Sequence, residues 1–184
     1  MRQLTLTVLA LAATAACSQT PVSPELVVPL VTTAVKTDEP LTSTHLRGDH
    51  EIPARPTDAQ GQAIMKVATD GNSISFKLIA SNIENVVASH IHIGSATVNG
   101  PVVVFLYGNA PAGGGRHDGI LSEGTFTAAN FTGPLAGQPF SALLAEIAAG
   151  NAYVNVHTND GVSPTNTGPG DFPGGEIRGQ IKAK

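Results

Sequence analysis

The stretch Ser73-Ile74-Ser75-Phe76-Lys77-Leu78-Ile79 alternates Ile74, Phe76 and Leu78 with Ser73, Ser75 and Lys77. A period of two places the two sets on opposite faces of an extended chain, so this stretch is predicted to be a strand with one buried and one wet face. The turn sequence Asp70-Gly71-Asn72 precedes it, and residues 63–67 form another strand-like run before that turn. The two runs therefore predict an antiparallel hairpin.

The same two-residue alternation recurs before and after this hairpin along the chain. Further strands are predicted at residues 86–93, 102–107, 120–126, 152–157 and 176–182. The Ala/Leu-rich stretch 141–149, which ends at Gly150, is the one plausible helix. With 20 Gly and 13 Pro available for turns, these short strands predict an all-β fold, an antiparallel Greek-key β-sandwich or barrel.

The N-terminus carries an export signal. Arg2 supplies a positive charge, and an apolar run from Leu4 to Ala16 follows it. The run is shorter than the roughly 20 residues that a bilayer-spanning helix needs, so it indicates a signal peptide. It ends in small residues before Cys17, the only cysteine of the chain, which predicts a lipoprotein signal with a lipidated Cys17. The alternative is an ordinary signal peptide cut after Ala15 or Ala16.

We therefore expect an extracytoplasmic lipoprotein of the cell envelope, whose partner is the membrane that holds its lipid anchor. Residues 1–17 are the signal peptide with its lipidated Cys, residues 18–40 a Pro-rich tether, and residues 41–184 the domain. Because Cys17 is the only cysteine, the domain has no disulfide. The formal net charge of −4 argues against a nucleic-acid partner, which requires a basic surface.

The alternation of side chains along the strands places three histidines on the face opposite the apolar residues, where core packing does not require them. His90 and His92 alternate with Ile91 and Ile93, and His157 follows Val154 and Val156 with opposite parity. If the aliphatic side chains face the core, the three imidazoles face outward. On the last strand, Glu176, Arg178 and Gln180 face outward in the same way, opposite Ile177 and Ile181.

These three histidines, His90, His92 and His157, predict a single metal ion held by imidazole nitrogen. Imidazole suits copper and zinc, and we expect copper because nitrogen donors favour it. His117 or a water molecule would supply a fourth ligand, and Asn155 or Glu176 would orient the rings. The alternative is that the histidines are ordinary polar residues of a solvated face.

Several blocks of the domain resemble the CHRD domain, a family named after chordin and found in bacterial exported proteins. The resemblance covers residues 46–184. Its motifs here are Leu46-Arg47-Gly48-Asp49-His50-Glu51-Ile52-Pro53, Ser89-His90-Ile91-His92-Ile93-Gly94, Gly100-Pro101-Val102-Val103-Val104, Gly150-Asn151-Ala152-Tyr153-Val154-Asn155-Val156-His157-Thr158 and Pro173-Gly174-Gly175-Glu176-Ile177-Arg178-Gly179-Gln180. The family has no general activity, so the resemblance implies a fold and leaves the function open.

The order of the histidine motifs also resembles copper–zinc superoxide dismutase. That resemblance implies that His90, His92 and His157 are copper ligands, that His117 lies at the zinc or fourth-ligand position, and that Arg178 guides a small anion such as superoxide. No His lies between Ile93 and Arg116, and the paired cysteines are absent, so a two-metal site is not expected. The fold is then either superoxide dismutase-like or immunoglobulin-like. Two function classes stay open: a copper-dependent redox enzyme, and a non-enzymatic surface-binding, structural or metal-storage module.

Overall fold

The computed structural model describes residues 40–183. Eight strands and one α-helix, α1 (Phe140–Ala148), make up the regular structure of this part of the chain. The strands are β1 (Pro40–Arg47), β2 (Gln60–Val67), β3 (Ser73–Glu84), β4 (Val86–Ile93), β5 (Val102–Tyr107), β6 (Arg116–Thr127), β7 (Ala152–Thr158) and β8 (Ile177–Gln180). Three short 3-10 turns, η1 (Gly48–His50), η2 (Ala128–Asn130) and η3 (Gly133–Leu135), complete the elements.

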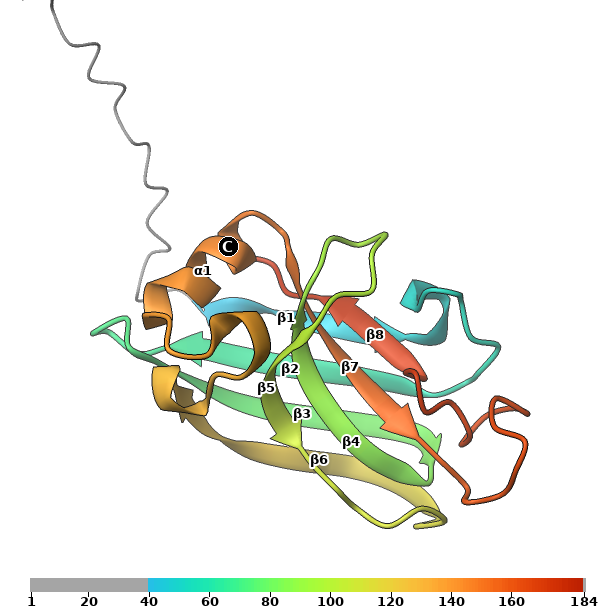
Figure 1. Ribbon diagram of the computed structural model, residues 1–184. Coiled ribbons are helices and arrows are strands. Elements are labelled where there is room, and N and C mark those ends of the chain that lie inside the picture. The colour runs from blue at the N-terminus through green and yellow to red at the C-terminus, as the bar shows by residue number, and fades with distance from the viewer. Residues whose placement is uncertain (1–39, 184) are drawn as a thin grey trace, which may run out of the picture. The chain divides into compact units, whose positions relative to one another are not determined.

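All eight strands belong to one antiparallel sheet in the order β5-β4-β7-β8-β1-β2-β3-β6. Figure 1 shows β5, β4, β7 and β8 crossing over β1, β2, β3 and β6, so that the sheet curls into a nearly closed barrel. At the seam between β5 and β6, the hydroxyl of Ser122 donates a 2.7 Å hydrogen bond to the carbonyl oxygen of Leu106. The pairing of β3 with β6 and of β4 with β7 joins strands that are not consecutive in the chain, as in a Greek key.

The barrel interior is the apolar core that the alternation predicted. Ile74 and Leu78 of β3, Ile91 of β4 and Ile177 of β8 are fully buried. The hairpin of β2 and β3 forms at the predicted turn, where Asp70 accepts a side-chain hydrogen bond from the backbone N–H of Asn72. The antiparallel all-β barrel is thus confirmed, with burial of aliphatic side chains as its main driving force.

The element boundaries agree with the sequence only in part: β2 begins at Gln60 rather than at residue 63, and β3 continues to Glu84 rather than ending at residue 79. Strands β4 and β5 have the predicted bounds, and α1 begins and ends one residue earlier than predicted. Strand β6 begins at Arg116 rather than at residue 120, because its first residues pair with Ile83 and Glu84 of β3. Strand β1 was not singled out, yet it is an interior strand between β8 and β2. The predicted signal peptide, Cys17 and the tether up to residue 39 lie outside the described residues.

The outward face of β4, β7 and β8 is not a solvated surface. Every residue of β7 is buried, in contrast to the alternating burial of β2. Connecting segments cover this face, and two of them are central below: the loop 94–101 between β4 and β5, and the loop 159–176 between β7 and β8. Polar side chains on this face are consequently shielded from much of the solvent, because they lie between the barrel and its loops.

Candidate metal centre

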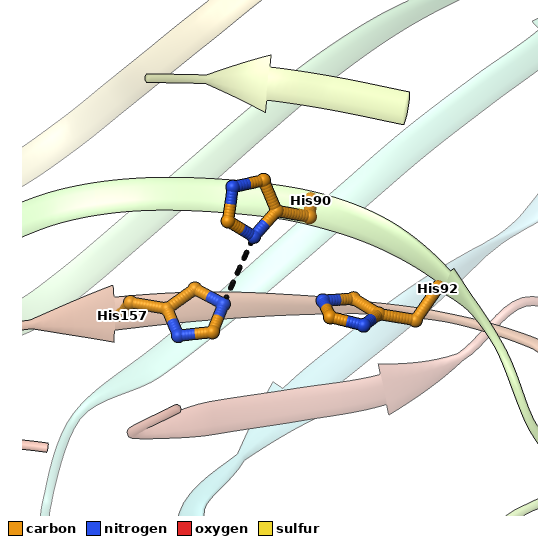
Figure 2. A group of neighbouring side chains, drawn as sticks. All are labelled: His90, His92 and His157. Carbon is orange, nitrogen blue, oxygen red and sulfur yellow. Dashed lines mark hydrogen bonds between the residues drawn. The ribbon is translucent and has the colours of Figure 1, made fainter. Parts of the chain in front are cut away.

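The three predicted histidines meet on the outward face of β4 and β7. His90 and His92 stand on β4, and His157 stands on β7, which pairs with β4 in antiparallel register. One ring nitrogen from each of the three lies within 4.8 Å of the other two, and Nδ1 of His90 is 3.1 Å from Nε2 of His157. Figure 2 shows the three rings converging on a common point.

In two of the three rings, a hydrogen bond to a backbone carbonyl decides which ring nitrogen faces the other histidines. Nδ1 of His92 lies 2.8 Å from the carbonyl oxygen of Gly100, and Nδ1 of His157 lies 2.8 Å from that of Pro173. A carbonyl oxygen only accepts, so each Nδ1 carries the proton and each Nε2 is left with its lone pair. Nε2 of His92 is buried and has no hydrogen-bond partner among the described residues. These are the tautomers that metal-ligating histidines adopt.

The protonation state of the cluster also suits a metal. Burial, with added repulsion from His157 and His92, lowers the pKa of His90 to about 4. Burial likewise lowers the pKa of His92 and of His157 below the ordinary value. All three rings are therefore neutral at pH 7, and only the Nδ1 proton of His90, which points at Nε2 of His157, has to move to the other ring nitrogen before a cation binds.

The spacing of the donors fits one transition-metal ion. Nitrogens bonded to one ion at about 2.0–2.1 Å are about 3 Å apart when adjacent and about 4 Å apart when opposite. The 3.1 Å between His90 and His157 matches an adjacent pair, and small ring rotations bring the third nitrogen within range. Since His90 is only half-buried beside the exposed Phe105, the centre has a side open to solvent.

Arg178 lies near this centre but does not face it. Arg178 as a residue is 1 % exposed, and its guanidinium packs on the ring of Tyr153, with Cζ 3.4 Å from the ring centre. The ring of His92 stacks on Tyr153 as well, at 4.8 Å between ring centres. Because β7 runs between β4 and β8, Tyr153 separates the guanidinium from His92.

His117 is not brought to the cluster. The sequence predicted His117 as a possible fourth ligand, but His117 lies within strand β6, opposite Ile83 of β3. Strand β6 is hydrogen-bonded to neither β4 nor β7, and the group of possible ligands in residues 40–183 contains only His90, His92 and His157. Nε2 of His117 is buried and has no hydrogen-bond partner within residues 40–183, and His117 lines a separate pocket with Val86, Tyr107 and residues 110–116.

The two residues expected to orient the rings have different positions. Asn155 is buried beside both the cluster and Glu51, and against the larger effect of burial its amide raises the pKa of His92 and lowers that of Glu51. Glu176 is hydrogen-bonded to other residues instead. Its carboxylate accepts hydrogen bonds from the hydroxyls of Thr57 and Thr158 and from the backbone N–H of Gly170. Glu176 therefore holds the loop 159–176, whose Pro173 carbonyl orients His157.

Glu51 is a residue that sequence reasoning missed. It is buried, and burial raises its pKa to about 7 against the opposing charges of Arg178 and Arg55. Its carboxylate occupies space next to Gly175, where a Cβ would overlap it. Only the resemblance of residues 46–53 to a family motif drew attention to this segment, because the strand pattern does not extend to it.

Comparisons with known proteins identify the family. No helix among residues 40–183 is long and apolar enough to cross a membrane, and no curated protein or solved structure matches the chain. A family model described as the CHRD domain matches residues 42–181, which include all eight strands except the first residues of β1. This match covers well over half of the chain, and the chain therefore belongs to the CHRD domain family.

Proposed function

We propose that this protein binds a single copper ion through Nδ1 of His90 and Nε2 of His92 and His157. The observation that carries the proposal is the convergence of three neutral imidazoles, two of which are held by backbone carbonyls with Nε2 turned to the common point. Copper is favoured over zinc because all donors are nitrogen and because Cu²⁺ binds such sites more tightly than Zn²⁺. Water completes the coordination on the open side.

The binding is tested by titrating the purified domain with Cu²⁺ in competition with a chelator, followed by electron paramagnetic resonance. One equivalent should bind with nitrogen hyperfine structure. His90→Ala, His92→Ala and His157→Ala should each weaken binding by at least about tenfold, while the exposed His45 provides a matched control, His45→Ala. Unchanged affinity in the three variants would overturn the site, and tighter binding of zinc would overturn the choice of metal.

Redox activity is a second candidate, supported by the open side of the centre next to His90. When bound, copper supplies one-electron chemistry: one superoxide loses an electron to leave O₂, and a second gains that electron with two protons to give H₂O₂. The burial of Arg178 behind Tyr153 leaves this chemistry without the expected anion guide. Superoxide decay in the presence of the copper-loaded protein and of His157→Ala separates this candidate from a binding or storage module, which would not accelerate the decay beyond buffer copper.

We also propose that the domain is anchored outside the cytoplasm by a lipid on Cys17. The support is the apolar run Leu4–Ala16 and the small residues before the only cysteine. Labelling with a fatty acid in cells should mark the wild type and not Cys17→Ala. Absence of label from both would refute lipidation, and an ordinary cleaved signal peptide would then explain the sequence.

A further inference from the structure

The carbonyl that orients His92 belongs to the loop 94–101, which is held at its ends by backbone hydrogen bonds of Ile93 to Pro101 and of Gly94 to Asn151. Gly100 is the residue before Pro101 in the loop 94–101, and the side chains of Thr97, Val98 and Asn99 in this loop are exposed. At Gly100 the backbone packs so tightly on Ile93 that a Cβ would overlap the Ile93 carbonyl. The position of the Gly100 carbonyl therefore depends on what holds the loop in place.

Arg178 is what holds the tip of this loop. Its Nη2 donates to the carbonyl oxygens of Ser95 at 2.7 Å and Val98 at 3.0 Å, and its Nη1 donates to Oδ1 of Asn99 at 3.0 Å. The amide of Asn99 in turn donates to the carbonyl oxygen of Ile52 at 2.6 Å. A guanidinium with its donors in a fixed planar fork restrains several acceptors at once, which an ammonium does not do.

Tyr153 contacts both Arg178 and the loop 94–101. Its hydroxyl accepts a 3.1 Å hydrogen bond from the backbone N–H of Gly100, the residue whose carbonyl accepts from His92. Its ring packs between the guanidinium of Arg178 and the imidazole of His92, nearly parallel to the latter with an interplanar angle of 9°. His92 is thus restrained twice, through the hydrogen bond to Gly100 and through the stack on Tyr153.

We propose that Arg178 is a positioning residue of the metal centre, which acts through Tyr153 and the loop 94–101 to hold His92 with Nδ1 protonated and Nε2 directed at the ion. Its significance for metal binding rests on the proposed function, whereas the orientation of His92 is a property of the metal-free protein. This role differs from that of an anion guide, because both Nη groups are occupied by the loop and Tyr153 lies between the guanidinium and His92.

Three variants break the arrangement at different points. Tyr153→Phe keeps the ring stack and removes the acceptor of the Gly100 N–H. Asn99→Ala removes one anchor of the loop at an exposed position, where folding is not at risk. Arg178→Lys keeps the charge and loses the fork. Ser95→Ala is the control in the same loop, because Arg178 binds the backbone carbonyl of Ser95, whereas the Ser95 hydroxyl makes a 3.4 Å hydrogen bond with Thr97.

The first measurement needs no metal. Long-range ¹H–¹⁵N spectra of the apo domain at pH 7.5 report the tautomer of each imidazole. His92 should be Nδ1-protonated in the wild type and in Ser95→Ala, and should become a mixture of tautomers in Tyr153→Phe and Arg178→Lys, with a smaller change in Asn99→Ala. A His92 that stays fully Nδ1-protonated in all three variants would overturn the inference.

The second measurement uses copper. The dissociation constant should rise about 10–100-fold in Tyr153→Phe and Arg178→Lys, with altered hyperfine couplings, and should not change in Ser95→Ala. Wild-type affinity and spectra in every variant would count against a positioning role. If wild-type protein binds no copper while the tautomer still shifts, the proposed function fails and the positioning of His92 by Arg178 stands.

Discussion

Single side chains on the outward face of this barrel behave unlike surface residues, because the covering loops remove much of the water from them. His90, His92, His157 and Glu51 all have their pKa moved toward the neutral form, and burial is the largest cause for each. Because burial favours the neutral imidazole, it keeps these rings in the protonation state that binds a metal ion. Two predictions at this scale follow from the directions of these shifts.

Copper affinity should survive mild acidification. An ordinary cluster of three histidines loses affinity as pH falls below about 6.5, because protons compete for the ring nitrogens. Here the pKa of His90 is lowered to about 4 and those of His92 and His157 are also lowered, so affinity should stay flat from pH 8 to below pH 6.5 and fall only on approach to the lowered values. Chelator competition measured at half-unit steps of pH checks this, and a steep loss beginning at pH 6.5 would contradict it.

Glu51 should make the domain less stable in alkali. Its pKa is about 7 when folded and about 4.5 in an unfolded chain, so its contribution is fully present below pH 4.5 and is lost as pH rises through 7. The whole difference is on the order of 3 kcal/mol. Glu51→Gln should therefore gain stability over the wild type at pH 8 and none at pH 4.5, as measured by urea unfolding.

The neighbouring Asp49 provides the control for this experiment. Its exposed carboxylate pairs with Arg47, whose hydrogen bond lowers the pKa of Asp49. Asp49→Asn should therefore show no gain at pH 8. An equal gain in both variants would mean that general charge repulsion, and not the burial of Glu51, sets the pH dependence.

At the scale of elements, the centre depends on loops that are tied to strands by buried polar groups. The loop 159–176 supplies the Pro173 carbonyl to His157, and Glu176 holds this loop through three donors. Glu176→Gln should destabilise the domain by about 2–3 kcal/mol, because an amide nitrogen would replace one acceptor and face a hydroxyl or N–H donor. Chemical unfolding measures the loss, and Glu123→Gln, at an exposed ion pair with Lys77, should change stability by less than about 1 kcal/mol.

The seam of the barrel gives a second prediction at this scale. The hydroxyl of Ser122 on β6 bonds to the Leu106 carbonyl on β5, where strands of the two sheet edges approach. Ser122→Ala should cost about 1 kcal/mol and should increase amide hydrogen exchange along β5 and β6 before other strands. The control is Ser75→Ala, whose hydroxyl makes a longer 3.4 Å contact at an exposed position. Equal protection of β5 and β6 in Ser122→Ala and wild type would show that this bond does not close the barrel.

For the whole molecule, an ion bound as proposed would link strand β4 to strand β7, so binding should stabilise the fold. A ligand at one hundred times its dissociation constant adds about 2.7 kcal/mol, which for a domain of this size corresponds to a rise in Tm of roughly 5–10 °C. Differential scanning calorimetry with and without Cu²⁺ measures the rise. His157→Ala should show none, and an equal rise in that variant would indicate binding elsewhere.

The sequence by itself determined the antiparallel all-β class of the fold and the identity of the clustered histidines. Alternation with Ile74, Ile91, Val154 and their neighbours decides which face of each strand is buried, because the side-chain period of a strand is two. That parity alone put His90, His92 and His157 on one face, and the structure brings them together. Parity succeeds here because it depends only on local geometry.

Tertiary structure alone decided the rest. Strand order made β4 and β7 neighbours and left His117 on β6, and no local pattern encodes which strands pair across the barrel. The carbonyls of Gly100 and Pro173 orient the rings as backbone groups, whose positions depend on loop conformation and not on residue type. Arg178 likewise faces the loop 94–101 and not the histidines, because Tyr153 on the intervening strand fills the space between them. Contacts that join segments distant in the chain depend on the balance of packing over the whole domain, which is why neither strand order nor loop position follows from any one stretch of sequence.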